Sequence, residues 1–269
     1  TTAGTPATPA VVVASGSHRI SAPVVLGAAT RFDVADDASL SIRELDAVGR
    51  DIFKLGAGQL SITPTASNSL TVNAGSLVIG DVSELPGNSV VRGITVDEGA
   101  ILDITDSIMV VDYDDGFSPL DRLPDYAGDG RFIGGRAAMG RIDPALTELT
   151  SFNGVELDAT SLVFRSTLPG DTNLDREVGF SDLLTLAQNY DENGTGKVWA
   201  QGDFDRDGTV GFSDLLSLAQ NYQGGAIVLG SGYSSEFVAA WTQAISVVPE
   251  PATLGLLAGV GLLAMRRRA

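Results

Sequence analysis

Cysteine is absent from the 269 residues, and histidine and lysine are almost absent. Without cysteine the chain can form neither disulfide bonds nor thiolate metal sites. The only histidine, His18, lies in a Ser-Gly-Ser-His segment, so a Ser-His-Asp triad has little support. Lys54 and Lys197 are the only lysines, and no P-loop or dinucleotide-binding glycine motif occurs. These absences argue against a Ser-His-Asp hydrolase, a P-loop nucleotide-binding enzyme and a dinucleotide-dependent enzyme.

Positive charge is scarce as a whole. The formal net charge is −17 and the isoelectric point is near 4.2. Phosphates would be repelled, so we expect no nucleic-acid partner. An acidic balance suits a cation-binding extracellular protein instead. The chain begins at Thr1 without a basic segment followed by an apolar one, which we interpret as a mature product or a fragment.

Short segments that alternate apolar and polar residues dominate residues 1–113, as expected for strands with one buried face. A Leu-x-Ile pattern recurs, and its leucines at 40, 60, 77 and 102 are separated by 20, 17 and 25 residues. A period near 20 is typical of a β-solenoid, in which each coil adds strands to the one below. The region resembles the repeats of autotransporter passenger domains. We predict a mainly β fold with a short β-solenoid here; a β-sandwich is the alternative.

Residues 114–169 have a mixed composition, which predicts an irregular connector. Within it, residues 161–165 alternate as a strand does. The composition changes again at Pro169-Gly170, where we place the boundary to the next region.

A duplicated acidic segment follows. Residues 178–190 and 210–222 differ only at Thr185 and Ser217, and acidic or amide residues recur at positions 1, 3, 5 and 12 of two twelve-residue loops. Calcium prefers many oxygen ligands in such a loop. We therefore predict two calcium ions, held by Asp171, Asn173, Asp175, Glu177 and Asp182 in the first loop and by Asp203, Asp205, Asp207, Thr209 and Asp214 in the second. Glu177 and Thr209 would contribute backbone carbonyls. A pair of acidic turns without metal is the alternative.

Each loop should lead into a helix, because Leu183, Leu186, Ala187 and Tyr190 share one apolar face and the second copy repeats it. The segments before the loops lack a helical pattern. We expect Val178 and Val210, at position 8, to join the loops through a β-bridge.

Loops with exit helices only, closed by aspartate at position 12, resemble the type I dockerin module over residues 170–222. The resemblance implies a cohesin-type partner, bound through Phe180, Ser181, Phe212 and Ser213; the alternative is that the phenylalanines pack in the module's own core. Arg176 departs from the loop pattern, which has glycine there. A left-handed backbone costs a non-glycine residue roughly 1–2 kcal/mol, so we expect the first loop to bind calcium more weakly.

The C-terminal residues 248–269 have three parts, preceded by an expected linker at 223–247. Pro249, Glu250 and Pro251 come first, then an apolar segment at 252–265, then Arg266, Arg267 and Arg268. Fourteen helical residues span roughly 21 Å, less than the ~30 Å hydrocarbon core, and the arginines should remain cytoplasmic. This order resembles the PEP-CTERM sorting signal. The resemblance implies an apolar transmembrane helix, an exosortase-like processing enzyme and transient anchoring; a generic tail anchor is the alternative.

These features together predict an exported structural or adhesive protein of the cell surface or extracellular matrix, which is not an enzyme. The alternative is a dockerin-bearing component of polysaccharide degradation, such as a β-helical lyase. The short solenoid and the lack of a compact Asp/Arg/Lys group argue against it, and no carboxylate pair stands out.

Overall fold

The computed structural model describes residues 9–47, 49–63, 65–80, 87–113, 128–224 and 233–248. The chain divides into two compact units, residues 1–168 and 169–269. The predicted boundary at Pro169-Gly170 therefore lies within one residue of the division. Each unit is described by itself below.

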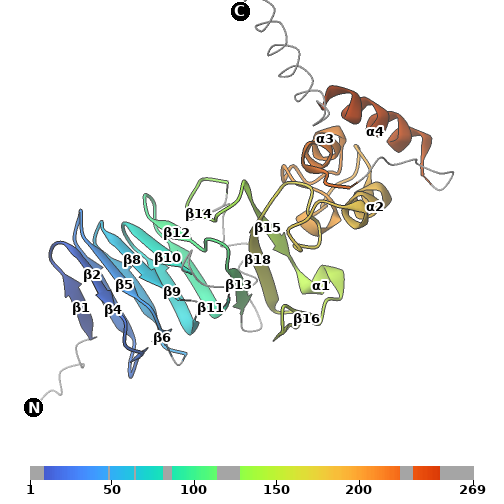
Figure 1. Ribbon diagram of the computed structural model, residues 1–269. Helices are drawn as coiled ribbons and strands as arrows, with labels where there is room; N and C mark the ends of the chain where they lie inside the picture. The colour runs from blue at the N-terminus through green and yellow to red at the C-terminus, as the bar shows by residue number, and fades with distance from the viewer. Residues whose placement is uncertain are drawn as a thin grey trace, which may run out of the picture. The chain divides into compact units, whose positions relative to one another are not determined.

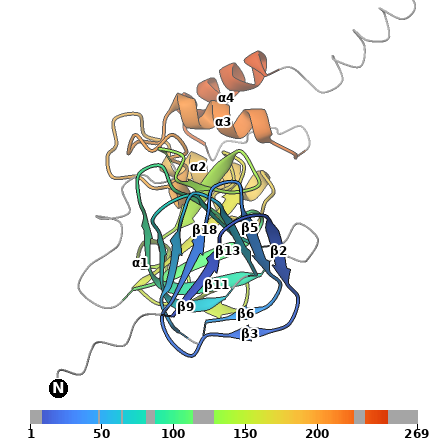
Figure 2. The same cartoon turned by 90° about the vertical axis from the view of Figure 1, so that its left-hand side faces the viewer.

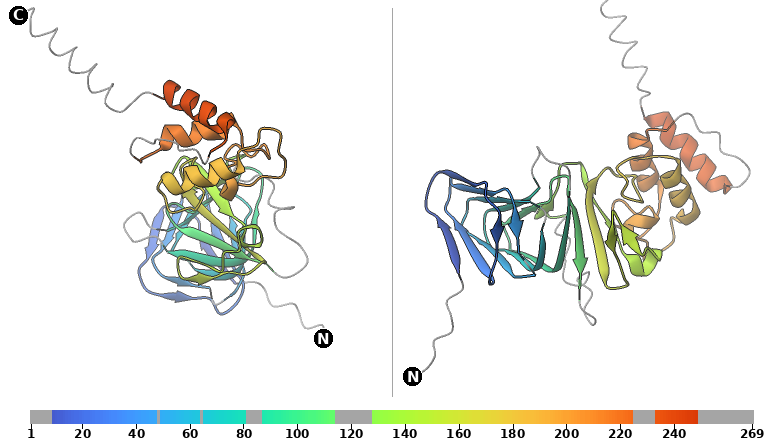
Figure 3. Two further views of the ribbon diagram at one scale, coloured as in Figure 1. Left: turned by 90° about the vertical axis from the view of Figure 1, so that its right-hand side faces the viewer. Right: turned by 60° about the horizontal axis from the view of Figure 1, so that its bottom comes forward.

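The first unit is a β-solenoid of about four turns. Parallel strands stack in two main sheets, and the chain adds to each sheet in turn (Figures 1 and 3). One sheet contains β1 (Ala10–Val13), β4 (Thr30–Val34), β7 (Ile52–Leu55), β9 (Ala66–Val72), β11 (Asn88–Val96) and β13 (Ile108–Asp112). The other contains β2 (Ser17–Ile20), β5 (Ser39–Ile42), β8 (Gln59–Ile62), β10 (Ser76–Ile79), β12 (Ile101–Asp103) and β14 (Phe132–Ile133).

A short parallel pair, β3 (Val24–Val25) with β6 (Leu45–Asp46), is separate from the two main sheets (Figure 2). The solenoid prediction is confirmed. The β-sandwich alternative is wrong, because the neighbouring strands of the repeat region run parallel and each joins the next by a further turn of the coil rather than by a hairpin.

The leucines of the sequence repeat form a ladder inside the solenoid. Leu40 pairs with Leu60, Leu60 with Leu77, and Leu77 with Leu102 in the strand register. All four are at most 3% exposed. The isoleucines two residues later, at 42, 62 and 79, stack in the same way. Each coil therefore buries its apolar pair against the coils on either side, which the repeat predicted.

Antiparallel strands extend the first sheet beyond the solenoid. Strand β13 pairs with β18 (Ser161–Thr167), and β18 pairs with β15 (Ala138–Ile142). Between these two strands lie α1 (Pro144–Thr147), β16 (Ser151–Phe152) and β17 (Val155–Glu156). The strand predicted at 161–165 is confirmed. From residue 128 onward, the described part of the predicted connector has short strands and one short helix, and it belongs to the first unit, in which β18 pairs with β13.

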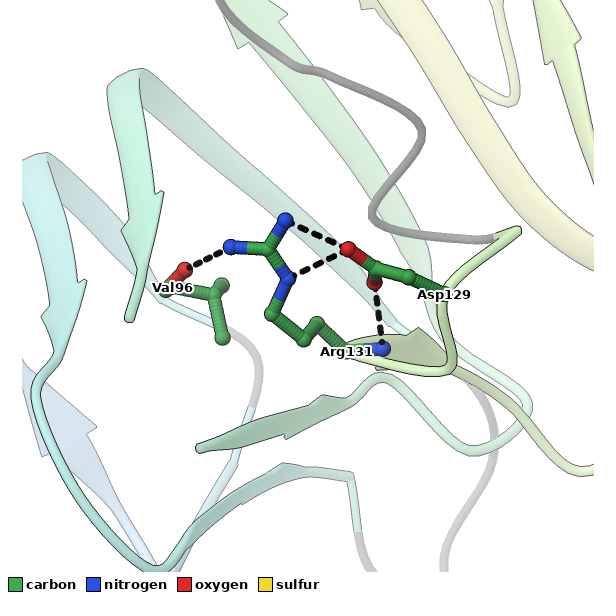
Figure 4. A network of polar contacts seen from close by, with 3 residues as sticks. All are labelled: Val96, Asp129 and Arg131. Carbon is green, nitrogen blue, oxygen red and sulfur yellow. Dashed lines mark hydrogen bonds and ion pairs between the residues drawn. The ribbon is translucent and has the colours of Figure 1, made fainter. Parts of the chain in front are cut away.

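An arginine fastens the segment before β14 to the solenoid (Figure 4). The Arg131 guanidinium donates to the carbonyl oxygen of Val96, at the end of β11, over 2.9 Å. It also binds the Asp129 carboxylate, through Nε at 2.6 Å and through a second ion-pair contact. The bond to Val96 joins the start of β14 to the end of β11, which belongs to the other main sheet.

In the described residues of the second unit there are three α-helices and a 3₁₀ turn: α2 (Phe180–Asn189), η2 (Trp199–Gln201), α3 (Phe212–Asn221) and α4 (Ser235–Val247). Helices α2 and α3 confirm the predicted exit helices. Before the second loop, η2 is a single turn, so the expected lack of an entering α-helix also holds there.

Helix α4 corrects the expected linker at 223–247. It packs beside α3 (Figure 1) and buries Phe237, Trp241 and Ala244. The Trp241 ring meets the Tyr222 ring edge to face, with centroids 5.9 Å apart. The apolar residues of α4 recur at helical spacing, and Ser234 caps its first turn by accepting from the Phe237 amide at 3.1 Å. Among the described helices, none is both long and apolar enough to cross a membrane.

Candidate calcium-binding loops

The two acidic loops share one backbone conformation. Leu174 and Arg176 have positive φ angles of 59° and 78°, and their equivalents Arg206 and Gly208 have 65° and 86°. Positions 4 and 6 are thus left-handed in both copies, which folds each loop tightly around its acidic side chains. Arg176 adopts the strained conformation that the sequence predicted for it.

The position 12 carboxylates close both loops. Asp182 Oδ2 accepts from the Gly179 amide at 2.9 Å, and Asp214 Oδ2 accepts from the Gly211 amide at the same distance. Their Oδ1 atoms accept from amides at the start of the loops, those of Thr172 at 2.9 Å and Phe204 at 2.7 Å. Each aspartate therefore joins the beginning of its loop to the first turn of the exit helix.

The position 1 carboxylates differ between the loops. Asp171 is fully buried, and its oxygens accept from the amides of Asp175 at 3.1 Å and Arg176 at 2.9 Å. Asp203 is 3% exposed, and its Oδ2 accepts from the Gly208 amide at 3.1 Å. Among the described residues, Asp203 Oδ1 is buried and has no hydrogen-bond partner. A buried carboxylate oxygen without a partner is costly unless a cation or donor satisfies it.

Asp203 belongs to a group of three carboxylates. Asp203, Asp205 and Asp214 each place an oxygen within 4.8 Å of the others. Burial raises the pKa of Asp203 to about 6, and it also raises the pKa of Asp214. The equivalent trio of the first loop is Asp171, Asn173 and Asp182, in which an amide replaces one carboxylate. The second loop therefore offers the stronger negative field to a cation.

The loops are joined differently from the expected bridge. Val210 forms a bridge with Asp191, whose amide donates to the Val210 carbonyl at 2.9 Å. The Val178 carbonyl accepts from the Gln223 amide at the same distance. The predicted Val178–Val210 bridge is wrong, because each position 8 pairs with the second residue after the exit helix of the other copy.

The glycine before each loop also packs closely against the exit helix of the other copy. A Cβ added at Gly170 would lie 3.0 Å from Leu218 Cα of α3, and one at Gly202 would lie 3.3 Å from Leu186 Cα of α2. Glycine directly before each loop therefore lets it approach the other copy's helix. Sequence analysis did not single out these glycines, although their 32-residue spacing matches that of the loops.

The predicted partner-binding phenylalanines differ in solvent exposure between the two copies. Phe180 is 54% exposed, whereas Phe212 is half-buried. Ser181 and Ser213 are both exposed, and the Ser213 hydroxyl donates to Asp205 at 2.7 Å. The alternative that both phenylalanines pack in the module's core is wrong for Phe180.

The remaining predicted ligands are exposed or half-buried on the loops: Asn173, Asp175, Glu177, Asp207 and Thr209. Sequence analysis missed Thr172, whose hydroxyl donates to Asp182 at 2.8 Å, and Trp199. A threonine beside an acidic ligand carries no distinct signal, so only the fold identifies it.

The family model described as the PEP-CTERM protein-sorting motif matches residues 247–269. The chain ends in a PEP-CTERM sorting motif. This motif indicates an exported cell-surface protein that associates with the membrane and is processed by an exosortase. Pro249, Glu250, Pro251 and the three terminal arginines lie within the match; they and the predicted apolar helix lie outside the described residues. No curated protein and no solved structure matches the chain.

Proposed function

We propose that this exported surface protein has a structural role, with a β-solenoid body and a second unit that binds calcium at two loops. The observation that carries the calcium proposal is Asp203: its buried Oδ1 has no hydrogen-bond partner among the described residues, and its carboxylate lies beside those of Asp205 and Asp214. The duplicated loop backbone supports a site in each copy. The proposal assigns no catalytic reaction to the chain.

The residues fit a hard cation. Carboxylate oxygens are the ligands that calcium prefers, and Asp203, Asp205, Asp207 and Asp214 would supply them in the second loop. A bound cation would offset the desolvation that raises the pKa of Asp203 and Asp214. In the first loop Asp171, Asn173, Asp175 and Asp182 would do the same with one carboxylate fewer, and position 7 would give a carbonyl in both.

The resemblance to dockerins extends the proposal to a cohesin-type partner. Phe180 and Leu184 on α2 are 54% and 37% exposed, which leaves an apolar face for docking. Their equivalents on α3, Phe212 and Leu216, are half-buried, and α3 packs beside α4. We therefore propose docking through the α2 copy, in one orientation rather than the two that identical copies would allow.

Calorimetric titration of calcium into the full chain tests the metal proposal. We expect two binding events, with a gain of helical circular dichroism. Asp182→Asn combined with Asp214→Asn should abolish both, and Asp203→Asn alone should remove the tighter one. Glu98→Gln with Glu156→Gln, two exposed carboxylates of the first unit, is the matched control and should bind as the parent does. No heat at millimolar calcium would refute the proposal.

A further inference from the structure

A cleft of about 330 Å³ lies on the solenoid, and all of its described lining residues belong to the first unit. Its floor is the outward face of β2, β5, β8 and β10. Arg19, Ser41 and Ser61 are in register on adjacent strands and all line it. Arg43 and Thr63 follow β5 and β8 and line it too. The repeat that stacks leucines inside therefore aligns polar side chains outside.

The charge of the cleft is opposite to that of the protein. Arg19 and Arg43 line it, and among its described lining residues there is no carboxylate, although the whole chain carries a net charge of −17. Both arginines are exposed. A guanidinium matches a carboxylate with two parallel hydrogen bonds, which makes arginine suited to carboxylate recognition.

The shape of the cleft suits a chain rather than a small ion. Adjacent strands are about 4.8 Å apart, so four strands extend across about 14 Å, longer than a single sugar ring. Ser41, Ser61, Thr63 and Gln59 distribute hydroxyl and amide groups along this length, where sugar hydroxyls could bond. No aromatic side chain is among the described lining residues, which disfavours base stacking by single-stranded nucleic acid.

We propose that this cleft binds an acidic polysaccharide, with Arg19 and Arg43 pairing with uronate carboxylates and the strand hydroxyls bonding the sugar rings. The site goes beyond the calcium proposal, since it uses only the first unit. An exported surface protein meets such polymers outside the cell, and the cleft would fasten the solenoid to them.

The test measures binding of the full chain to an oligogalacturonate by calorimetry, with chelator present so that calcium cannot bridge the two. Its methyl-esterified form, which has the same backbone without the charge, is the ligand control. We expect binding of the acidic form only, with an affinity that falls as salt rises. Arg19→Gln with Arg43→Gln should weaken it at least about tenfold, since each charged hydrogen bond contributes strongly.

The matched control is Arg50→Gln, an exposed arginine outside the cleft, which should leave affinity unchanged. Circular dichroism and thermal unfolding check that each variant folds. The proposal is overturned if the oligogalacturonate does not bind, if the esterified form binds equally, or if the double variant binds as the parent does. Displacement by inorganic sulfate beyond that caused by sodium chloride at the same ionic strength would also overturn it, because the cleft would then recognise single anions rather than a chain. The calcium titration is unaffected by any of these outcomes.

Discussion

The indole nitrogen of Trp199 donates a hydrogen bond of 2.7 Å to the backbone carbonyl oxygen of Asp171. Trp199 is 4% exposed, and its ring meets that of Phe204 edge to face with centroids 5.1 Å apart. Phe204 directly follows Asp203, so one side chain contacts the first residue of one loop and the second residue of the other. Trp199 therefore contacts both loops.

Replacing Trp199 with phenylalanine should lower the free energy of unfolding of the second unit by roughly 1 kcal/mol, because the buried Asp171 carbonyl loses its donor. It should also weaken calcium binding at the first loop. Thermal unfolding and calorimetric titration of the full chain measure both effects. Trp241→Phe controls for the loss of indole area, and equal effects from the two variants would contradict this prediction.

The left-handed backbone at position 6 should decide which of the two loops binds calcium more tightly. Arg176→Gly should tighten calcium binding at the first loop by up to about tenfold, since glycine adopts φ 78° without the penalty of roughly 1–2 kcal/mol. Gly208→Ala should weaken the second loop for the converse reason. Site-resolved dissociation constants, obtained in an Asp203→Asn or Asp171→Asn background, check the prediction. No change at either loop would show that the loops relax around the substitution.

Helix α4 should be part of the stable second unit. Trp241 is 5% exposed against Tyr222, and a buried Trp→Ala change typically costs 3–5 kcal/mol. Trp241→Ala should therefore lower the unfolding temperature of the second unit and leave that of the first unchanged. Differential scanning calorimetry follows the two transitions. Ile245→Ala, at a residue of the same helix that is 47% exposed, should have little effect.

Lys54 should make the first unit more stable as the pH rises above about 8. Its side chain is fully buried on β7, and its Nζ donates to the carbonyl oxygens of Leu55, Gly56 and Ala74 at 2.7–3.0 Å. Burial lowers the pKa of Lys54 from 10.5 to about 8, and the negative charge of Asp33 offsets part of this shift. Between pH 8 and pH 10.5 the side chain of Lys54 is protonated in the unfolded chain and largely neutral in the folded one. The unfolded chain therefore binds more protons, so raising the pH favours folding.

The measurement is the unfolding temperature of the first unit from pH 7 to pH 11. Lys54→Met removes the titrating group and should abolish the rise between pH 8 and pH 10.5, whatever its effect at neutral pH. Arg50→Gln, on the surface, should retain the rise. A parent protein without any rise would mean that the ammonium stays charged in the folded state.

Local patterns determined much of this protein. The spacing of Leu40, Leu60, Leu77 and Leu102 predicted the solenoid, because strand register forces equivalent residues of successive coils to stack. The duplicated loops and exit helices followed from a repeat of 32 residues and from apolar spacing. The sorting motif lies in one continuous segment, so sequence alone identified it.

Contacts between distant segments were decided only by the tertiary structure. Nothing near Val178 indicates that its carbonyl receives the Gln223 amide, and nothing in residues 223–247 signals that Trp241 packs on Tyr222. Phe180 and Phe212 have identical neighbours on the helix side, yet one is 54% exposed and the other half-buried. A repeat specifies equal local structure in both copies. Which phenylalanine is covered therefore depends on packing between distant segments, which the repeat does not encode.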